Sequence, residues 1–327
     1  MTFAECLDTL VRTRENLRAQ ELLNAGLNAT AFSVIRTGSE LGPELLVFHG
    51  TAEQLFPQQT LDELATAGIT LTVFERDATG GLPKPLPAEE LEYAEKVLAS
   101  PVPPLCCGGR VYTDPNTPEV GTIGCLAKRN GVLGMVTCQH VTADSADGRL
   151  FWPRGDHVVA GPGAETVGAV SARTLYGNAF PDRPVTLDAA FVPLAMSRAE
   201  VSSQISGAGQ PLRVAAQPLP DLSLIGRSVT AVGSTSGRRH GAIRGVLYEG
   251  YQDHLLTDYL IVSESGLPLS TGGDSGSVWL TADTLELVAL NHSSKVLTLN
   301  QVSSVVALAS NLDAVFRQLG LQLVNDM

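Results

Sequence analysis

The chain has 327 residues, 44% of them hydrophobic, with 32 glycines and 19 prolines. This composition is typical of a globular, turn-rich protein and excludes a disordered chain, and the length favours two domains over one. A formal net charge of −12 argues against nucleic acid or an anionic membrane as the main partner. No apolar run approaches the length of a membrane span.

The start of the chain and its cysteines favour a cytoplasmic protein. Residues 1–5 lack the basic region and following apolar core of a secretory signal. The five cysteines are odd in number and form no apparent disulfide framework, so a reducing compartment is expected. The adjacent Cys106 and Cys107 could bind a metal or form a vicinal disulfide. Because no second pair follows at metal-ligand spacing, we expect two buried thiols, and neither a metal site nor a cofactor.

Residues 1–78 predict a small α/β module in which the order of elements is α-β-β-α-β. Thr2 and Glu5 have the spacing of a capping box that begins a first helix. Thr60 and Glu63 repeat that spacing for a second helix, and Gly68 would end it. Three strands are expected, at Ala31–Ile35, Glu44–Phe48 and Ile69–Phe74.

Residues 79–104 predict a linker that proline partly stiffens. Within it, Ala88–Ala99 has the apolar spacing of one amphipathic helix, which the following prolines end. Neither the linker nor the module contains a catalytic constellation, since His49 is better explained as a buried or capping residue. We therefore expect residues 1–78 to recruit substrate, bind a protein partner or mediate self-association.

From Val111 onward the chain consists of short strands and turns, which are typical of all-β barrels. A first hairpin would join Val120–Ala127 to Gly134–Thr137, since Asn130-Gly131 suits a turn with positive φ. Residues 197–225 have few strand signals and would connect barrel 1 (about 105–200) to barrel 2 (about 226–305), with a helix over 311–320 after it. Further strands are expected at His157–Ala160, Val167–Ser171, Ala189–Leu194, Val229–Gly233, Tyr259–Val262, Ser277–Leu280, Leu285–Leu290 and Val296–Val302.

The segment Ser270–Trp279 has the pattern of a turn that presents a reactive serine. Gly272, Gly273 and Gly276 surround Ser275, and a short apolar strand follows. Glycine lets the backbone adopt strained dihedral angles and lets a substrate carbonyl approach closely. Successive N–H groups of such a turn can converge on an oxyanion. Because a serine hydroxyl is a weak nucleophile, a base and an orienting acid must lie elsewhere in the chain.

Two upstream segments supply a candidate base and a candidate acid. The apolar strand Met135–Thr137 leads to His140, and Asp188 leads directly into the apolar run Ala189–Leu194. With Ser275, these residues follow in the order His, Asp, Ser. Other acids lie near Asp188, but none leads directly into an apolar strand: Asp144, Asp147, Asp156 and Asp182.

These motifs, with Gly273-Asp274-Ser275-Gly276 around the serine, resemble those of trypsin/chymotrypsin-like serine proteases, and the histidine motif is similar to that of the bacterial, HtrA-like branch. The resemblance covers about residues 105–322 and implies an all-β chymotrypsin-like double β-barrel over 105–327, preceded here by the small α/β domain. It implies that Ser275 is the nucleophile, that His140 is the general base and that Asp188 orients the imidazole. The backbone N–H groups of Gly273 and Ser275 would form the oxyanion hole.

The resemblance also implies a primary specificity pocket. Its walls would be Leu269, Ser270 and Thr271 on one side and Asn291, His292 and Ser293 on the other. A leucine at position 269 in place of an acid argues against a preference for Lys or Arg. His292 is similar to a residue with which some relatives receive acidic side chains, although a surface-turn histidine explains it equally well.

The chain departs from the family's pattern in two places. Val141 replaces the usual cysteine beside the histidine, and Cys138 lies two residues before His140. The simplest members have no counterpart of the N-terminal module. No clear activation sequence follows a basic residue near position 105, so Asp274 is not expected to require a new N-terminal amine. We expect the uncut chain to be active, with the activating order supplied by a partner or by self-assembly.

The sequence therefore predicts a cytoplasmic, bacterial serine endopeptidase that acts on a protein or peptide and is regulated through residues 1–78. An alternative is a scaffold that keeps the protease fold and uses its site only for binding. The joint presence of His140, Asp188 and Ser275 disfavours that alternative. An esterase or acyl transferase that uses the same three residues is the other possibility.

Overall fold

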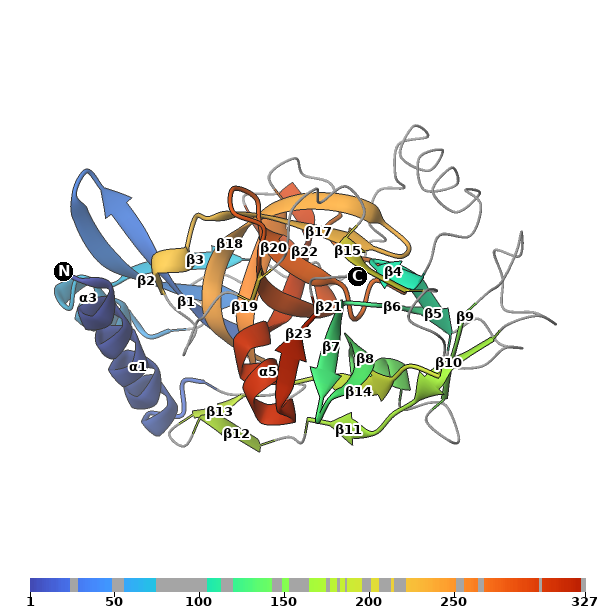
Figure 1. The fold of residues 1–327 in the computed structure, drawn as a ribbon. Coiled ribbons are helices and arrows are strands. Elements are labelled where there is room, and N and C mark those ends of the chain that lie inside the picture. Colours follow the sequence, from blue (N-terminus) through green and yellow to red (C-terminus); the bar gives the residue numbers. More distant parts are fainter. Residues whose placement is uncertain are drawn as a thin grey trace.

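The computed structural model describes residues 1–23, 29–48, 56–74, 105–112, 120–142, 149–152, 165–174, 177–180, 183–185, 187–195, 201–205, 213–214, 222–250, 256–263, 268–299 and 302–324. These residues form two β-barrels with a helix-and-strand unit at the N-terminal side (Figure 1). The predicted fold class, a chymotrypsin-like double β-barrel preceded by a small α/β unit, is confirmed by the strand order and pairing. No described helix combines the length and the apolar character needed to cross a membrane.

Barrel 2 is a closed sheet of six strands. Its strand order is β17-β20-β21-β22-β19-β18, and β18 pairs back with β17 to close it. The strands are β17 (Ser228–Gly233), β18 (Gly237–Gly250), β19 (Leu256–Ser263), β20 (Val278–Thr281), β21 (Glu286–Leu299) and β22 (Val302–Asn311). The short strand β16 (Arg213–Val214) adds to β21 in parallel.

Barrel 1 consists of two sheets, whose orders are β10-β9-β5-β6 and β11-β14-β8-β7-β23. The strands are β5 (Arg110–Tyr112), β6 (Val120–Thr122), β7 (Cys125–Arg129), β8 (Val132–Thr137), β9 (Arg149–Trp152), β10 (Glu165–Ala169), β11 (Ala172–Arg173), β14 (Ala190–Pro193) and β23 (Leu321–Leu323). The predicted hairpin is confirmed, since Asn130 (φ 51°) and Gly131 (φ 80°) form the turn between β7 and β8. Two further pairs are β12 (Gly177–Phe180) with β13 (Arg183–Val185), and β4 (Leu105–Cys107) with β15 (Val201–Ile205).

The N-terminal elements follow the predicted order. They are α1 (Phe3–Ala19), β1 (Ala29–Thr37), β2 (Glu40–Phe48), α3 (Gln58–Thr66) and β3 (Thr70–Phe74). The capping box of Thr2 and Glu5 is confirmed, with both of its reciprocal hydrogen bonds present. The second capping box is wrong: α3 begins at Gln58 after Pro57, and Thr60 is buried inside the helix. Proline suits a helix start because its missing N–H would have no intrahelical partner there.

The strands of this N-terminal unit continue the sheet of barrel 2. Strand β1 pairs with the far half of β18, and β2 and β3 extend the sheet beyond it. One face of the extension packs with α1 into a core that includes Phe32, Tyr259 and Trp279. The other face contributes Phe48 to a second core cluster, which also contains Leu297, Val306 and Leu308 of the β21–β22 hairpin. The domain limits 1–78, 79–104 and 105–327 stay predictions, but residues 1–74 are built into barrel 2 wherever the structure describes them.

Two strand predictions and the prediction of one connection need correction. The strand expected at Val296–Val302 is wrong, because β21 runs on to Leu299 and β22 begins at Val302. Only the polar pair Asn300-Gln301 separates the two strands, and no glycine or proline marks the end of the first. The connection expected over 197–225 contains β15 and β16. The strand expected at Val120–Ala127 breaks between β6 and β7, where Gly124 packs against the Gly276 carbonyl. The predictions on His49, 79–104, Ala88–Ala99 and His157–Ala160 lie outside the described residues.

The C-terminal helix α5 (Leu312–Leu319) connects the two barrels, close to the predicted range of 311–320. Asn311 caps its start by accepting a hydrogen bond from the Ala314 amide at 3.0 Å, and Gly320 (φ 64°) ends it. The chain then forms β23, which pairs with β7 of barrel 1. The apolar face of α5 joins residues of both barrels in one core cluster.

A buried carboxylate lies behind the cap of α5. Asp258 is fully buried, and its Oδ2 accepts the Asn311 amide at 2.5 Å, whereas its Oδ1 has no partner in the described part of the chain. Burial raises the pKa of Asp258 to about 7, against 3.8 ordinarily. The folded protein therefore binds a proton more tightly than the unfolded chain between these values. As pH rises from about 4 to about 7, this residue is expected to cost stability.

Asp258→Asn is expected to remove that pH dependence. An asparagine keeps the acceptor for the Asn311 amide and carries no charge, so the variant should gain relative to the wild type as pH rises. The gain in the free energy of unfolding should be small at pH 4 and reach at most about 4 kcal/mol at pH 8. Urea unfolding of both proteins at the two pH values measures it. A gain that is equal at both values would contradict the assignment.

Candidate active site

His140 begins a short 3-10 turn, η1 (His140–Thr142), just after β8. Thr142 closes this turn through hydrogen bonds from its amide and its hydroxyl to the Gln139 carbonyl, at 2.9 and 2.6 Å. Val141 is buried against Gly121, where an added Cβ would lie 2.2 Å from Val141 Cγ1. The apolar contact of Val141 with Gly121 thus holds the loop that follows β8. In the trypsin/chymotrypsin-like proteases that the motif resembles, a cysteine occupies this position.

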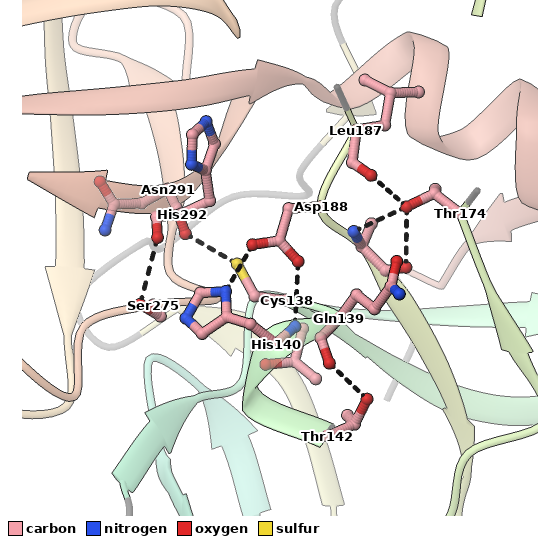
Figure 2. Close-up of polar contacts among 12 residues, drawn as sticks. Cys138, Gln139, His140, Thr142, Thr174, Leu187, Asp188, Ser275, Asn291 and His292 are labelled. Carbon is pink, nitrogen blue, oxygen red and sulfur yellow. Dashed lines mark hydrogen bonds and ion pairs between the residues drawn. The ribbon is translucent and has the colours of Figure 1, made fainter. Parts of the chain in front are cut away.

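Asp188 lies directly before β14, whose residue Ala190 pairs with Thr137 of β8. This pairing brings Asp188 to His140, which donates two hydrogen bonds to it. The His140 amide reaches Oδ1 at 3.0 Å, and ring Nδ1 contacts Oδ2 (Figure 2). Burial raises the pKa of Asp188, but the hydrogen bond and the charge of His140 outweigh it and leave the pKa below 3.8. The carboxylate is therefore ionised at neutral pH and able to fix the Nδ1–H tautomer.

Thr174 holds the backbone on both sides of Asp188, and the sequence analysis missed it. Its hydroxyl accepts a hydrogen bond from the Ala189 amide at 3.0 Å and lies against the Leu187 carbonyl (Figure 2). Its amide donates to the Ala189 carbonyl at 2.8 Å. Thr174 belongs to no recognisable sequence motif. Only the fold therefore reveals its hydrogen bonds to the backbone around Asp188.

The serine turn (Thr271–Ser277) depends on glycine at two positions. Gly273 and Gly276 have φ values of 99° and 97°, a region that other residues rarely adopt. A Cβ on Gly276 would also lie 2.2 Å from the Thr122 carbonyl. Barrel 1 holds the turn through Thr122, whose amide donates to the Ser275 carbonyl at 2.8 Å and whose hydroxyl donates to the Gly273 carbonyl at 2.8 Å.

The amides of the serine turn divide into two groups. Those of Asp274, Gly276 and Ser277 donate to the carbonyls of Thr271, Asn291 and Asp274. The other amides of the turn, among them those of Gly273 and Ser275, donate to no carbonyl of the described backbone. The amides of Gly273 and Ser275 are the ones predicted to form the oxyanion hole. Their position on the turn leaves them able to bind a substrate oxygen.

Strand β21 contacts both the serine turn and the histidine loop. The Ser275 hydroxyl donates a long hydrogen bond of 3.4 Å to the His292 carbonyl, and Cys138 Sγ donates to the Asn291 carbonyl at 3.1 Å. In Figure 2 the imidazole of His140 lies between Asp188 and Ser275, with its second nitrogen turned toward the serine. Proton transfer from Ser275 to His140 would require the hydroxyl to turn from the His292 carbonyl toward the imidazole, and hydrogen bonds of this kind often tighten only when substrate binds.

The residues predicted to wall a specificity pocket are largely buried. Leu269 is 3% exposed and packs into the core of barrel 2. Asn291 joins the two predicted walls, because its Nδ2 donates to Ser270 Oγ at 2.9 Å while its Oδ1 accepts Trp279 Nε1 at 3.4 Å. Its side chain is thus a structural tie. Thr271 is tied to Asp274 by its amide and its hydroxyl.

His292 is a buried residue, so its interpretation as a surface-turn histidine is wrong. Its Nε2 contacts Thr257 Oγ1 at 2.7 Å. The Thr257 hydroxyl donates its one proton to the Ala309 carbonyl at 2.9 Å, so it accepts a proton from Nε2 of His292. Burial lowers the pKa of His292 to about 4, which leaves the imidazole neutral at pH 7.

Comparison with known proteins places the chain in a family. The family model of the Nal1 C-terminal domain matches residues 103–287, which is more than half of the chain. The chain belongs to this family. A curated Nal1 relative, Protein NARROW LEAF 1 from rice (Oryza sativa subsp. japonica), is 30% identical over 223 residues, 61% of this chain. The chain spans only 37% of the length of the rice protein.

This Nal1-family chain is also similar to several solved structures. A glutamic acid specific serine protease has a TM-score of 0.46 and 18% identity over 67% of this chain and 100% of its own. Thermobifida fusca Protease A has a TM-score of 0.44 and 20% identity over 68% and 99%. Cellulomonas bogoriensis chymotrypsin has a TM-score of 0.43 and 18% identity over 68% and 99%.

Cys138 is a further residue beside His140 and Asp188, and its sequence motif did not predict this contact. Its side chain is fully buried, and burial raises the pKa of the thiol well above 9.0. Its sulfur lies close to both His140 and Asp188. The five cysteines of the chain are free thiols.

Proposed function

We propose that this chain is a serine endopeptidase that hydrolyses peptide bonds through Ser275, His140 and Asp188 and an acyl-enzyme, as a member of the trypsin/chymotrypsin-like proteases. The observation that carries the proposal is the pair of hydrogen bonds from His140 to Asp188, next to a serine turn in which the amides of Gly273 and Ser275 donate to no carbonyl of the described backbone. Chemistry of this kind needs a base with a fixed tautomer and a site for the oxyanion.

In the proposed mechanism, His140 Nε2 takes the proton of Ser275 as the hydroxyl attacks the substrate carbonyl. Asp188 keeps the Nδ1–H tautomer and offsets the charge of the imidazolium that forms. The amides of Gly273 and Ser275 bind the developing oxyanion, and each such donor is worth about 3–4 kcal/mol in comparable enzymes. His140 then gives its proton to the leaving amine. Water attacks the acyl-enzyme by the same steps to release Ser275.

Labelling with a fluorophosphonate probe tests the proposal. The wild-type chain is expected to be labelled, and Ser275→Ala and His140→Ala are not. Digestion of casein or a peptide library then separates a protease from the alternatives. Labelling with cleavage of esters but not of peptides would favour an esterase. Absence of labelling in the folded wild type would favour a scaffold that binds without catalysis.

The activation of the uncut chain is a second proposal. The Asp274 carboxylate is buried and accepts the amides of Thr235 and Ser236 at 3.0 Å and that of Thr271 at 2.8 Å. These amides satisfy the carboxylate, so it needs no amine released by cleavage. We expect the chain of full mass, checked by mass spectrometry, to react with the probe as fast as any trimmed form. Dependence on trimming near residues 105–111 would contradict this.

The residues near Ser275 also suggest a substrate preference. We propose that Lys and Arg are poor P1 residues, because the apolar Leu269 stands where a basic side chain would need an acid. The neutral His292 lacks the charge that would attract a glutamate. At pH 8, peptides with Leu or Ala before the cleaved bond should therefore react faster than those with Glu or Arg. A preference for Glu would contradict this proposal and would indicate that His292 binds the acidic side chain directly.

Residues 1–74 are proposed to serve in regulation through a protein partner or a second copy of the chain. The outward side of α3 carries Asp62 and Glu63, and its side chains border an open hollow.

The free cysteines are compatible with the expected cytoplasmic location, whereas the rice relative gives no support to a bacterial source. For the proposed regulation through residues 1–74, light scattering of the full chain tests self-association. A chain that stays monomeric at all concentrations would leave a different protein as the partner.

A further inference from the structure

A thiol lies beside the proposed catalytic pair, and the proposed mechanism gives it no task. The sulfur of Cys138, a ring nitrogen of His140 and a carboxylate oxygen of Asp188 all lie within 4.8 Å of one another. Cys138 follows β8, and Asp188 precedes β14, the strand that pairs with β8. The sheet of barrel 1 therefore fixes the three groups together (Figure 2).

These three groups are the ligands that zinc prefers in proteins. Zn²⁺ binds thiolate, imidazole and carboxylate at about 2.0–2.3 Å, usually with four ligands in a tetrahedron. One thiolate and one carboxylate supply two negative charges, which balance the ion in a largely buried site. The side chain of His140 is 49% exposed, so this side of the site is open to solvent. A water molecule could complete the coordination there.

We propose that Cys138, His140 and Asp188 form an inhibitory Zn²⁺ site. The ion binds through Cys138 Sγ, Nδ1 of His140 and an oxygen of Asp188. Binding of the ion depends only on these ligands, whereas the inhibition rests on the proposed function of Ser275.

The proposed binding of Zn²⁺ disables His140 as the general base, because it moves the imidazole proton from Nδ1 to Nε2. In the metal-free enzyme, the neutral imidazole carries its proton on Nδ1 and leaves Nε2 able to accept the proton of Ser275. A metal bond from Nδ1 uses the lone pair on that nitrogen, so the imidazole proton must move to Nε2. The thiol of Cys138 loses its proton to solvent, and one proton is released per ion bound. A chelator that removes the ion restores the starting state.

Binding of Co²⁺ to the full chain tests the site without reference to catalysis. A sulfur-to-cobalt charge-transfer band in the near ultraviolet is expected for the wild type, and ZnCl₂ should displace it. Cys138→Ser should lose the band, and its metal affinity should fall by at least about 100-fold, since loss of a group that only orients a ligand already costs about 10–100-fold. Cys106→Ser, which changes a partly buried thiol outside the site, should keep the band. Asp188→Asn tests the carboxylate ligand in case Cys138→Ser fails to fold.

Inhibition by the metal is measured as the rate of fluorophosphonate labelling of Ser275. The rate of each variant is compared with its own rate without metal. ZnCl₂ should slow labelling of the wild type and of Cys106→Ser, and EDTA should restore it. Labelling of Cys138→Ser should need at least about 100-fold more ZnCl₂ for the same effect. A wild type that is labelled but shows no cobalt–sulfur band would overturn the site, as would a band that persists in Cys138→Ser. A cobalt–sulfur band without any labelling would support the metal site while the proposed protease function fails.

Discussion

Replacement of Ser275 by alanine is expected to lower kcat for a peptide substrate by about 10⁶-fold, the size of effect seen when a nucleophile is removed from a comparable triad. The change removes one oxygen, whose hydrogen bond to the His292 carbonyl is long, at 3.4 Å. The turn itself is held by Thr122 and by the amide–carbonyl bonds of Gly276 and Ser277. The melting temperature should therefore change by less than about 2 °C.

His140→Ala should cause a loss of similar size, and the double variant should be no worse than either single variant. Such non-additivity is expected when two residues act in one proton transfer. Ser171→Ala changes an exposed serine of barrel 1 and serves as the matched control, with no expected effect. Stopped-flow kinetics of a chromogenic peptide and circular dichroism melts provide the measurements. A Ser275→Ala enzyme within tenfold of the wild type would rule out the proposed nucleophile.

Asp188→Asn is expected to lower kcat by about 10⁴-fold while the fold persists, as in a triad whose acid is replaced by its amide. The asparagine has nearly the same shape, but its amide can donate to Nδ1 and so favour the tautomer with the proton on Nε2. That tautomer cannot accept the proton of Ser275. Asp283→Asn makes the same chemical change at an exposed position and should leave kcat unchanged.

The stability of Asp188→Asn should also depend on pH with a definite sign. The pKa of Asp188 is lowered in the folded protein, so its ionised form stabilises the fold at pH values above the ordinary 3.8. That contribution is lost as pH falls through the lowered value, where the carboxylate is protonated in the folded state as well. The variant should therefore be less stable than the wild type at pH 7 and approach it at low pH. Urea unfolding measures the stability of both proteins. If the stability deficit of Asp188→Asn grew as pH fell, the stabilising contact between His140 and ionised Asp188 would be contradicted.

The sequence by itself determined the features that depend on neighbouring residues. The capping box of Thr2 and Glu5, the turn at Asn130-Gly131 and the end of α5 at Gly320 are local, because each follows from the conformation or hydrogen bonding of a few consecutive residues. The motifs around His140, Asp188 and Ser275 were recognisable for the same reason. Each places a reactive side chain at the end or the start of a strand or in a glycine-rich turn.

Only the tertiary structure decided how those segments meet. Thr122 holds the serine turn from the other barrel, Asn291 ties the predicted pocket walls together, and Cys138 lies beside His140 and Asp188. The N-terminal strands, predicted as a separate module, extend the sheet of barrel 2 instead. Contacts between residues far apart in the chain depend on strand order and register. Neither property is encoded in the local pattern of a single strand, so the sequence could name the reacting groups but not the residues that hold them in place.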